Sequence, residues 1–524
     1  MSWQYLLAWL LPLFAGSGVV LAIGGHRRMP GNLCAMAGTG FLLGLFVTGI
    51  LCGLVARDNV QSAFADVAPW LAAIGILAWV AALGLRGKPW PEASFVQGNT
   101  DPGFFARRSR EGGNLVSLPF NRMKALDPRL RGDEGNKSAL PKFALGWRLV
   151  WWLLLAMIGL RIHALASEVL LRPTFPWDAW AAWAVKPKAW FLLGHYAGYE
   201  PMQQWLANPG TTLRTSAIWD YPELLAWIQV WFASAEGSWN EPLINAVWLG
   251  VLVAIGLGSY GSWRALGVAP LWSMILVYGL LSLPLIDAHV ALAGYADLWL
   301  AATFGLAILS WLRWLRWKQH GQWLLAAALA ICMPFIKLEG AVWLLIASVL
   351  AGLTLLPQRW RWMTVGAIVL MLGAGLLFGG LVLPVFGLGW VHLSWGSVVV
   401  PALGELDLHW HPVGVEMLSG LFTLPNWHLL WYLLPLVLVL RWRGFLVDQT
   451  LRWLGILLLC CATFLFVLFF FTEASAWAEN YTSSNRLIMH LVPAVFTLMA
   501  LLLRGVSVPG ADRAPGCAVP NAPA

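Results

Sequence analysis

A polar, tryptophan-rich stretch begins where a long apolar run of the chain ends. Residues 173–180 read PTFPWDAW, the preceding apolar run covers 146–167, and the polar stretch closes with WDYP at 219–222. A carboxylate close to a membrane helix is costly to hold charged, so we interpret Asp178 as a functional group with a cationic or hydrogen-bonding partner nearby. The alternative is an interfacial loop whose tryptophans anchor it at the level of the lipid headgroups.

The composition is typical of a polytopic membrane protein. Hydrophobic residues make up 59% of the 524 residues and charged residues 11%, and the mean hydropathy is +0.70, whereas a soluble chain carries roughly a quarter charged residues. Many of the 36 tryptophans flank apolar runs, as expected for an interfacial belt. The net charge of +8 indicates basic cytoplasmic loops and does not require nucleic acid as a partner. The six cysteines lack metal-ligand spacing and indicate no disulfide framework.

Apolar runs predict an all-α fold of about 13 membrane-spanning helices, each able to cross roughly 30 Å of hydrocarbon. The N-terminus is interpreted as the first span and not as a removed signal peptide. Basic clusters at 313–318, 359–361 and 441–443 then face the cytoplasm, and the C-terminus lies inside. The short apolar run 221–232 is predicted to be an interfacial or re-entrant helix. If it crossed the membrane, the orientation of every later span and loop would be inverted. The predicted spans are 3–23, 33–55, 67–85, 146–167, 241–258, 268–285, 296–312, 321–336, 339–356, 363–386, 427–440, 451–471 and 487–504.

Two segments fall outside the predicted helical core. Residues 86–145 are polar, rich in Gly, Pro and Arg, and lack apolar periodicity, which predicts a disordered, basic cytoplasmic linker. Contact of this segment with anionic lipid is the alternative. Residues 505–524 predict a disordered tail. The expected organisation is therefore three N-terminal helices within 1–85, the linker, a transmembrane core over 146–504, and the tail.

Acidic groups gather on the outer face that this topology predicts. Asp178 could act as a general base toward an acceptor hydroxyl, because partial burial raises the affinity of a carboxylate for protons. Alternatively it caps a short helix over 179–192. Asp297 either caps the next span or, with Asp287 or His289 assisting, holds a divalent cation against a phosphate. His289 alone is a weak signal.

Basic groups lie at span ends on the same predicted face. Lys337 and Arg486 either snorkel to the interface as cations or neutralise a lipid-linked phosphate as it leaves. Glu339 would pair with Lys337 or orient it. Lys186 and Lys188 are expected only to face solvent.

Two other kinds of site receive little support. His409 and His411 lie in the polar segment 387–426 and form no recognisable metal-ligand set. A Gly-rich nucleotide loop is not found either, because the closely spaced glycines belong to apolar runs and no strand is predicted to carry such a loop. A soluble nucleotide sugar or ATP is therefore not the expected substrate.

Several short motifs, taken in order, resemble those of the GT-C superfamily of integral membrane glycosyltransferases, which includes protein O-mannosyltransferases and lipid A aminoarabinose transferases. Each motif is short, and it is their order and their shared face that carry the resemblance. The similarity covers roughly residues 146–504 and rests on FPWD at 175–178, YPELL at 221–225, GYADL at 294–298, KLEG at 337–340, NRL at 485–487 and VPA at 492–494.

The resemblance implies a helical, GT-C-like catalytic core in which juxtamembrane helices of the first outer loop lie over the active site. It implies an inverting transferase in the bacterial inner membrane, with the active site on the periplasmic face. The sugar donor would be a polyprenyl phosphate, the acceptor a glycan, lipid or protein, and membrane lipid a further partner.

The resemblance also implies roles for individual residues. Asp178 matches the family's early acidic residue and takes the role of general base. The family's phosphate-binding basic residue maps onto Arg486 or Lys337, with Glu339 and Tyr221 in the donor site. A divalent cation, Mg²⁺ or Mn²⁺, is the cofactor such a site could hold. Because Ala179 follows Asp178, a metal site built on adjacent acids is not supported.

Two other functions stay open. A transporter or flippase is expected to show internal repeats and ionisable groups near the middle of the membrane, whereas the charged groups here are predicted at one face. A lipid-linked polysaccharide polymerase or ligase is expected to use a large outer loop rich in Arg and His. The segment 387–426 contains His but no Arg, which counts against a polymerase or ligase.

Overall fold

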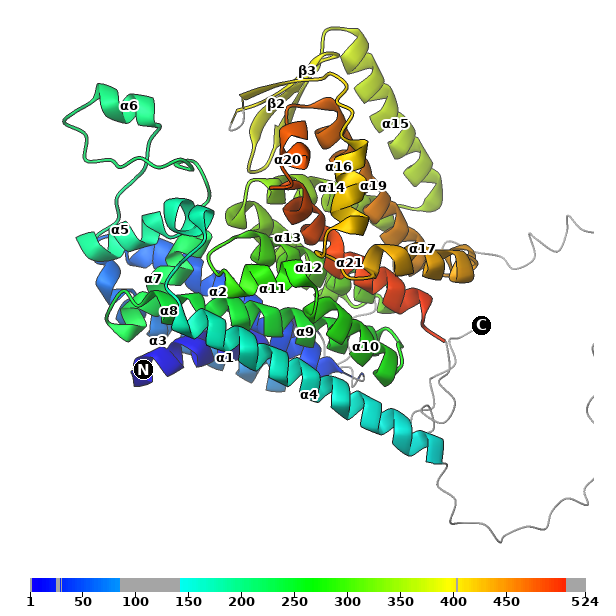
Figure 1. Cartoon of the computed structure of the whole chain (residues 1–524), viewed down its shortest axis with the longest axis horizontal. Helices are drawn as coiled ribbons and strands as arrows, with labels where there is room; N and C mark the ends of the chain where they lie inside the picture. Colours follow the sequence, from blue (N-terminus) through cyan, green and yellow to red (C-terminus); the bar gives the residue numbers. More distant parts are fainter. Residues whose placement is uncertain (1, 25–28, 30, 85–141, 402–403, 506–524) are drawn as a thin grey trace, which may run out of the picture. The chain divides into compact units, whose positions relative to one another are not determined.

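The protein is helical over most of its described length, with one small sheet (Figure 1). The predicted linker 86–145 and tail 505–524 lie outside the described residues, apart from 142–145 and Gly505. The structure, a computed structural model, describes residues 2–24, 29, 31–84, 142–401 and 404–505.

The helices of the first half are numbered in chain order. They are α1 (Trp3–Gly24), α2 (Asn32–Val55), α3 (Ala63–Gly84), α4 (Lys142–Leu171), α5 (Val185–Leu193), α6 (Met202–Ala207), α7 (Leu224–Glu236), α8 (Glu241–Asn245), α9 (Val247–Ala265), α10 (Pro270–Leu281) and α11 (Pro284–Ala291). A 3-10 turn over Val60–Ser62 leads into α3, and a π-helical turn over Ala179–Trp183 leads into α5.

The second half contains the remaining helices and the sheet. Its helices are α12 (Asp297–Trp317), α13 (His320–Ile336), α14 (Glu339–Leu355), α15 (Gln358–Leu377), α16 (Gly414–Leu418), α17 (Leu430–Arg441), α18 (Gly444–Val447), α19 (Gln449–Phe471), α20 (Ser475–Glu479) and α21 (Ser484–Leu502), with a π-helical turn over Ser419–Thr423. Its strands are β1 (Leu381–Val385), β2 (Gly389–Leu393), β3 (Ser397–Val400) and β4 (Gly404–Asp407).

The prediction of a multi-pass membrane protein is confirmed. Nine helices in the described part of the chain are long and apolar enough to cross a membrane, and the pair α10–α11 makes a tenth if it counts as one span. The count of about 13 stays a prediction, because the other three predicted spans fall on the shorter apolar helices α13, α14 and α17. Of these, α17 has only 12 residues, which is about 18 Å of helix.

One predicted span is bent. The run 268–285 is divided between α10 and α11, which meet at an angle of 58°. Pro284 causes the break, because a proline disfavours helical geometry at the residue before it and is itself well suited to the first turn of a new helix.

Another predicted span, 363–386, is helical only as far as Leu377. Gly379 and Gly380 both have positive φ, a conformation that glycine adopts at little cost and that stops a helix. The chain then forms a four-stranded antiparallel sheet in the order β1-β2-β3-β4, which lies beside α15 (Figure 1). The sheet was not predicted, because its short strands lie mostly in the segment interpreted as a polar loop.

The run 221–232, predicted to be an interfacial or re-entrant helix, forms α7. Every residue from Leu224 to Ala235 is buried, and α7 packs against α2, α3 and α5. An interfacial helix would keep one polar face exposed. The helix is therefore part of the core, although its 13 residues are too few to cross roughly 30 Å of hydrocarbon.

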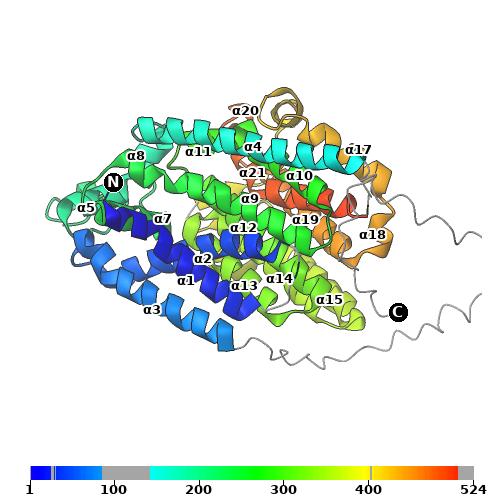
Figure 2. The same ribbon diagram turned by 90° about the horizontal axis from the view of Figure 1, so that it is seen from below.

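Among the nine candidate membrane spans of the described residues, α12 and α21 are the most buried, with 100% and 94% of their most apolar stretch inside the protein. They pack against each other, and α12 also packs against α9 and α13. In contrast, α4 is mostly exposed and runs alongside α9 and α11, as Figure 2 shows. The first turns of α12 and α21 carry the charged groups described below.

Candidate functional site

Asp178 and Arg486 form an ion pair although 308 residues separate them in the chain. The guanidinium Nη1 of Arg486 donates to Oδ2 of Asp178 over 2.6 Å. Asp178 precedes the π-helical turn that leads into α5, but its side chain makes no capping hydrogen bond. The pair is open to solvent, since the side chains of Asp178 and Arg486 are 37% and 20% exposed.

Three further groups orient the Arg486 side chain in the first turn of α21. Its Nη2 donates to the hydroxyl of Ser483 over 2.8 Å. Its guanidinium carbon lies 5.3 Å from the centre of the Tyr295 ring, and its Nη1 lies 4.0 Å from Oδ2 of Asp297. A guanidinium is planar and donates in fixed directions, so these contacts set the direction in which Arg486 faces.

Asp297, the first residue of α12, is the buried anion of the site. Its side chain is 1% exposed, and its Oδ1 accepts from Nζ of Lys337 over 2.8 Å and from Nε2 of His490 over 3.0 Å. A buried carboxylate is stable only when it is paired and hydrogen-bonded. Asp297 is therefore a fixed structural charge that links the first turns of α12 and α21 to the end of α13.

The partners of Asp297 on α21 are one helical turn apart. His490 follows Arg486 by four residues, so the two side chains lie on the same face of the helix. The indole N–H of Trp343 on α14 donates to Nδ1 of His490 over 3.1 Å. His490 and Trp343 were not predicted as site residues, although a histidine inside an apolar run is a signal that could have drawn attention to α21.

Lys337 joins α13 to α14 and bridges two carboxylates. Besides Asp297, its Nζ contacts Oε1 of Glu339 over 2.9 Å, as the sequence predicted. Burial and the negative charge of Glu339 raise the pKa of Tyr221 above its ordinary value of 10.0. The Lys337 ammonium is nearly enclosed, whereas Arg486 is accessible.

The three predicted metal ligands do not come together in the described structure. Asp287 on α11 forms an ion pair with Arg161 of α4, and Nδ1 of His289 lies 2.8 Å from the carbonyl oxygen of Leu285. At Asp297, the ammonium of Lys337 occupies the place where a cation would compensate the carboxylate. Among the described residues these three side chains thus form no shared ligand set, and a divalent cation at this place stays a prediction.

Lys186 differs most from its prediction. It was expected to face solvent, but it is 3% exposed, and its Nζ donates to the carbonyls of Trp219 and Tyr221 over 2.8 and 2.9 Å. Burial lowers its pKa below the ordinary value of 10.5. Lys186 thus ties α5 to the end of the polar stretch and fixes the backbone of Tyr221. Lys188, in contrast, is half exposed and pairs with Glu241.

The site therefore has an open ion pair, Asp178–Arg486, next to a closed network around Asp297. The open pair offers one group that can accept a proton and one that can hold an anion, and the closed network keeps Arg486 in place. Comparisons of the chain with protein-family models, with curated proteins and with solved structures found no match.

Proposed function

We propose that the protein is an inverting glycosyltransferase of the bacterial inner membrane, which moves a sugar from a polyprenyl phosphate to an acceptor at the periplasmic face. The observation that carries this proposal is the accessible contact between Asp178 and Arg486. A proton acceptor and an anion-binding cation in one place are the two groups that a transfer of this kind needs.

In the proposed reaction Asp178 removes the proton from an acceptor hydroxyl or amine. The acceptor atom attacks the anomeric carbon, and the bond from that carbon to the phosphate oxygen breaks with its electron pair on the oxygen. The leaving polyprenyl phosphate therefore gains a negative charge, which Arg486 stabilises because a fixed cation is already aimed at it. A single displacement inverts the anomeric centre.

Arg486 suits the phosphate better than Lys337 does. The Lys337 ammonium is nearly enclosed and already contacts Asp297 and Glu339, so a phosphate reaches it only by breaking a buried pair. Arg486 donates a hydrogen bond to Ser483 and lies over the ring of Tyr295, but its side chain stays accessible to solvent. No step of the proposed reaction requires a divalent cation.

The surroundings of Asp178 suit a lipid-linked donor. Phe175, Trp177 and Trp180 flank it in the chain and expose most or half of their side-chain surface. The rings of Trp177 and Trp180 meet edge to face with centres 4.8 Å apart. Aromatic side chains of this kind are favoured at the boundary between lipid and water, where the phosphate of a polyprenyl phosphate lies.

The reaction is tested with purified protein in vesicles and a panel of short-chain polyprenyl phosphate sugars, with membrane lipid extract as the source of acceptor. The readout is polyprenyl phosphate released, measured by mass spectrometry, because it does not require the acceptor to be known. We expect Asp178→Asn to lower turnover by about 10²- to 10⁴-fold and Arg486→Ala by about 10²- to 10³-fold.

Two exposed residues supply matched controls. Asp407→Asn on β4 and Arg214→Ala in the outer loop make the same changes of charge outside the site, and turnover should stay at the wild-type level. The proposal is wrong if the wild-type protein releases no polyprenyl phosphate from any donor, or if Asp178→Asn retains full turnover. Passage of intact donor across the vesicle membrane without bond cleavage would instead indicate a flippase.

Sidedness has its own test. Asn208 is exposed in the same loop as the Asp178 stretch, and Lys318 is exposed at the opposite end of α12 from Asp297. A membrane-impermeant maleimide added to intact cells should label Asn208→Cys and not Lys318→Cys. Labelling of Lys318→Cys alone would place Asp178 at the cytoplasmic face and contradict the proposal.

A further inference from the structure

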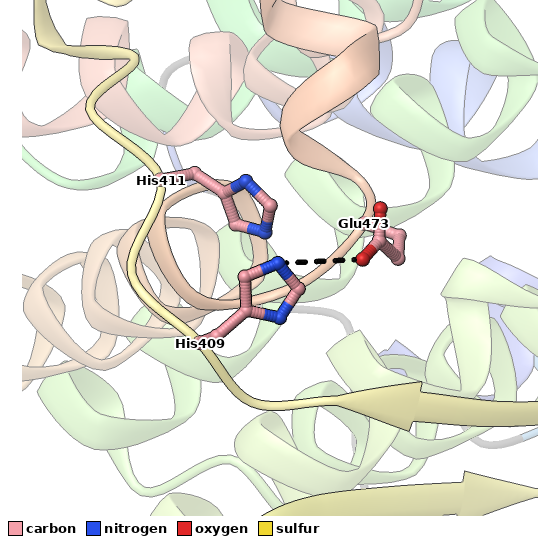
Figure 3. A group of neighbouring side chains, drawn as sticks. All are labelled: His409, His411 and Glu473. Carbon is pink, nitrogen blue, oxygen red and sulfur yellow. Dashed lines mark ion pairs between the residues drawn. The ribbon is translucent and has the colours of Figure 1, made fainter.

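Two histidines and a glutamate form a second cluster, which shares no residue with the site above. Figure 3 shows the side chains of His409, His411 and Glu473 close together. One ligand atom of each lies within 4.8 Å of the others, a condition met by no other group of His, Cys, Asp and Glu in the part of the chain that the structure describes. The ring centres of His409 and His411 are 4.0 Å apart.

The backbone explains why the two histidines face the same way. The N–H of His409 donates to the carbonyl of Phe471 over 3.0 Å, and the N–H of His411 donates to the carbonyl of Phe470 over 2.8 Å. Residues two apart in an extended chain project to the same side. Glu473 lies two residues past the end of α19, so the helix end that receives these hydrogen bonds also presents the carboxylate.

The residue between the histidines anchors the segment. The ring of Trp410 packs against Phe470 and Phe471 at the end of α19, with ring centres 5.4 and 5.3 Å away. The segment is therefore fixed by both hydrogen bonds and apolar contact. A ligand set held in this way loses little freedom when an ion binds, which favours binding.

The ligand atoms are available to an ion. Nε2 of His411 is buried and makes no hydrogen bond within the described residues, and a buried polar atom of this kind is costly to leave unsatisfied. His409 and Glu473 are about half and two thirds exposed, so an ion can reach the cluster from solvent. Two neutral imidazoles and one carboxylate would supply three ligands.

We propose that His409, His411 and Glu473 bind a transition-metal ion, with Zn²⁺ as the best fit and water as the fourth ligand. Zinc binds histidine nitrogens at about 2.0–2.1 Å in a tetrahedral arrangement, which places adjacent ligand atoms roughly 3.3–3.5 Å apart. The observed separation of His409 Nε2 and Glu473 Oε1 is 3.4 Å. Mg²⁺ and Ca²⁺ prefer oxygen ligands, so two imidazoles select against them.

The position of the cluster suggests what the ion does. It would tie the segment after β4 to the chain that leads through α20 to Ser483 and Arg486. The ion would therefore stabilise the segment that leads into the first turn of α21. Its binding does not depend on whether the protein transfers a sugar.

Metal content tests the proposal directly. The protein is made with an affinity tag that contains no histidine, and bound metal is removed with a chelator. It is then dialysed against micromolar Zn²⁺, and its zinc content is measured by inductively coupled plasma mass spectrometry. We expect about one Zn²⁺ per chain, and less than about a tenth of that in His409→Ala, His411→Ala and Glu473→Gln. His392→Ala on β2 and Glu405→Gln on β4 are exposed controls and should keep the ion.

Two measurements guard against misfolded variants and adventitious zinc. Stripped wild-type protein and both controls should gain thermal stability when Zn²⁺ is added, and the three ligand variants should not, while all elute as a single species on size exclusion. The fine structure of the X-ray absorption spectrum at zinc should show two imidazole ligands together with oxygen ligands. Zinc retained by the ligand variants, zinc lost equally from the controls, or a wild-type protein without zinc would each overturn the proposal.

Discussion

Trp343 of α14 determines which nitrogen of His490 faces Asp297. The indole N–H donates to Nδ1 of His490 over 3.1 Å, and an indole can only donate. Nδ1 is therefore the acceptor, and Nε2 carries the proton that it donates to Asp297 over 3.0 Å. The neutral imidazole thus acts as a hydrogen-bonding bridge between α14 and the buried carboxylate of α12.

This bridge leads to a prediction for Trp343→Phe. The substitution keeps an aromatic ring but removes the N–H, so Nδ1 of His490 becomes a buried acceptor without a donor. We expect a loss of about 1–3 kcal/mol of stability, measured as a lower melting temperature in detergent by intrinsic fluorescence. Trp477→Phe, at an exposed position on α20, is the control, and an equal change in both variants would contradict the assignment.

A second prediction concerns the buried pair of Asp297 and Lys337. Removing either charge leaves the other buried without its main partner, so Asp297→Asn and Lys337→Met should each cost about 3–5 kcal/mol. The double variant should cost less than the sum of the two by about 1–3 kcal/mol. The measurement is a double-mutant cycle on melting temperature. Lys337→Met combined with Asp407→Asn serves as the control cycle, for which the costs should add.

The arrangement of charged groups was partly predictable from sequence. Asp178, Asp297, Lys337 and Arg486 all lie next to the ends of apolar runs, and the order of the runs places these ends at one membrane face. The structure brings the four side chains into one series of contacts, because α12 packs against both α13 and α21. When several helix ends meet at one face, the charged side chains at these ends lie close to one another.

Contacts between the middles of helices were not predictable. Whether His490 meets Trp343 depends on how α21 and α14 are rotated about their axes, and hydropathy alone does not set this rotation. The same holds for Arg161, which pairs with Asp287. The cluster of His409, His411 and Glu473 was missed because its third member lies far along the chain.

A third prediction uses the buried lysine of α5. Burial lowers the pKa of Lys186 below 10.5, although Glu223 and Asp220 oppose the shift. The folded protein therefore binds fewer protons than the unfolded chain between the lowered pKa and 10.5, and its stability rises with pH across that window. The melting temperature of the wild type minus that of Lys186→Met should increase as the pH rises towards about 10.5. A difference that does not change with pH would show that Lys186 is not desolvated.

The last prediction concerns the contact between α1 and α2. A Cβ at Gly44 would lie 1.9 Å from the carbonyl oxygen of Pro12, so Gly44→Ala forces two backbones apart. Small residues allow such close approach between apolar helices, and overpacking costs about 1–3 kcal/mol. Gly366 of α15 has nothing within 4 Å of its Cβ position, and Gly366→Ala should be neutral or stabilising by up to about 1 kcal/mol. Melting temperatures of the two variants check this, and a loss in Gly366→Ala as large as that in Gly44→Ala would show that the effect does not come from contact with Pro12.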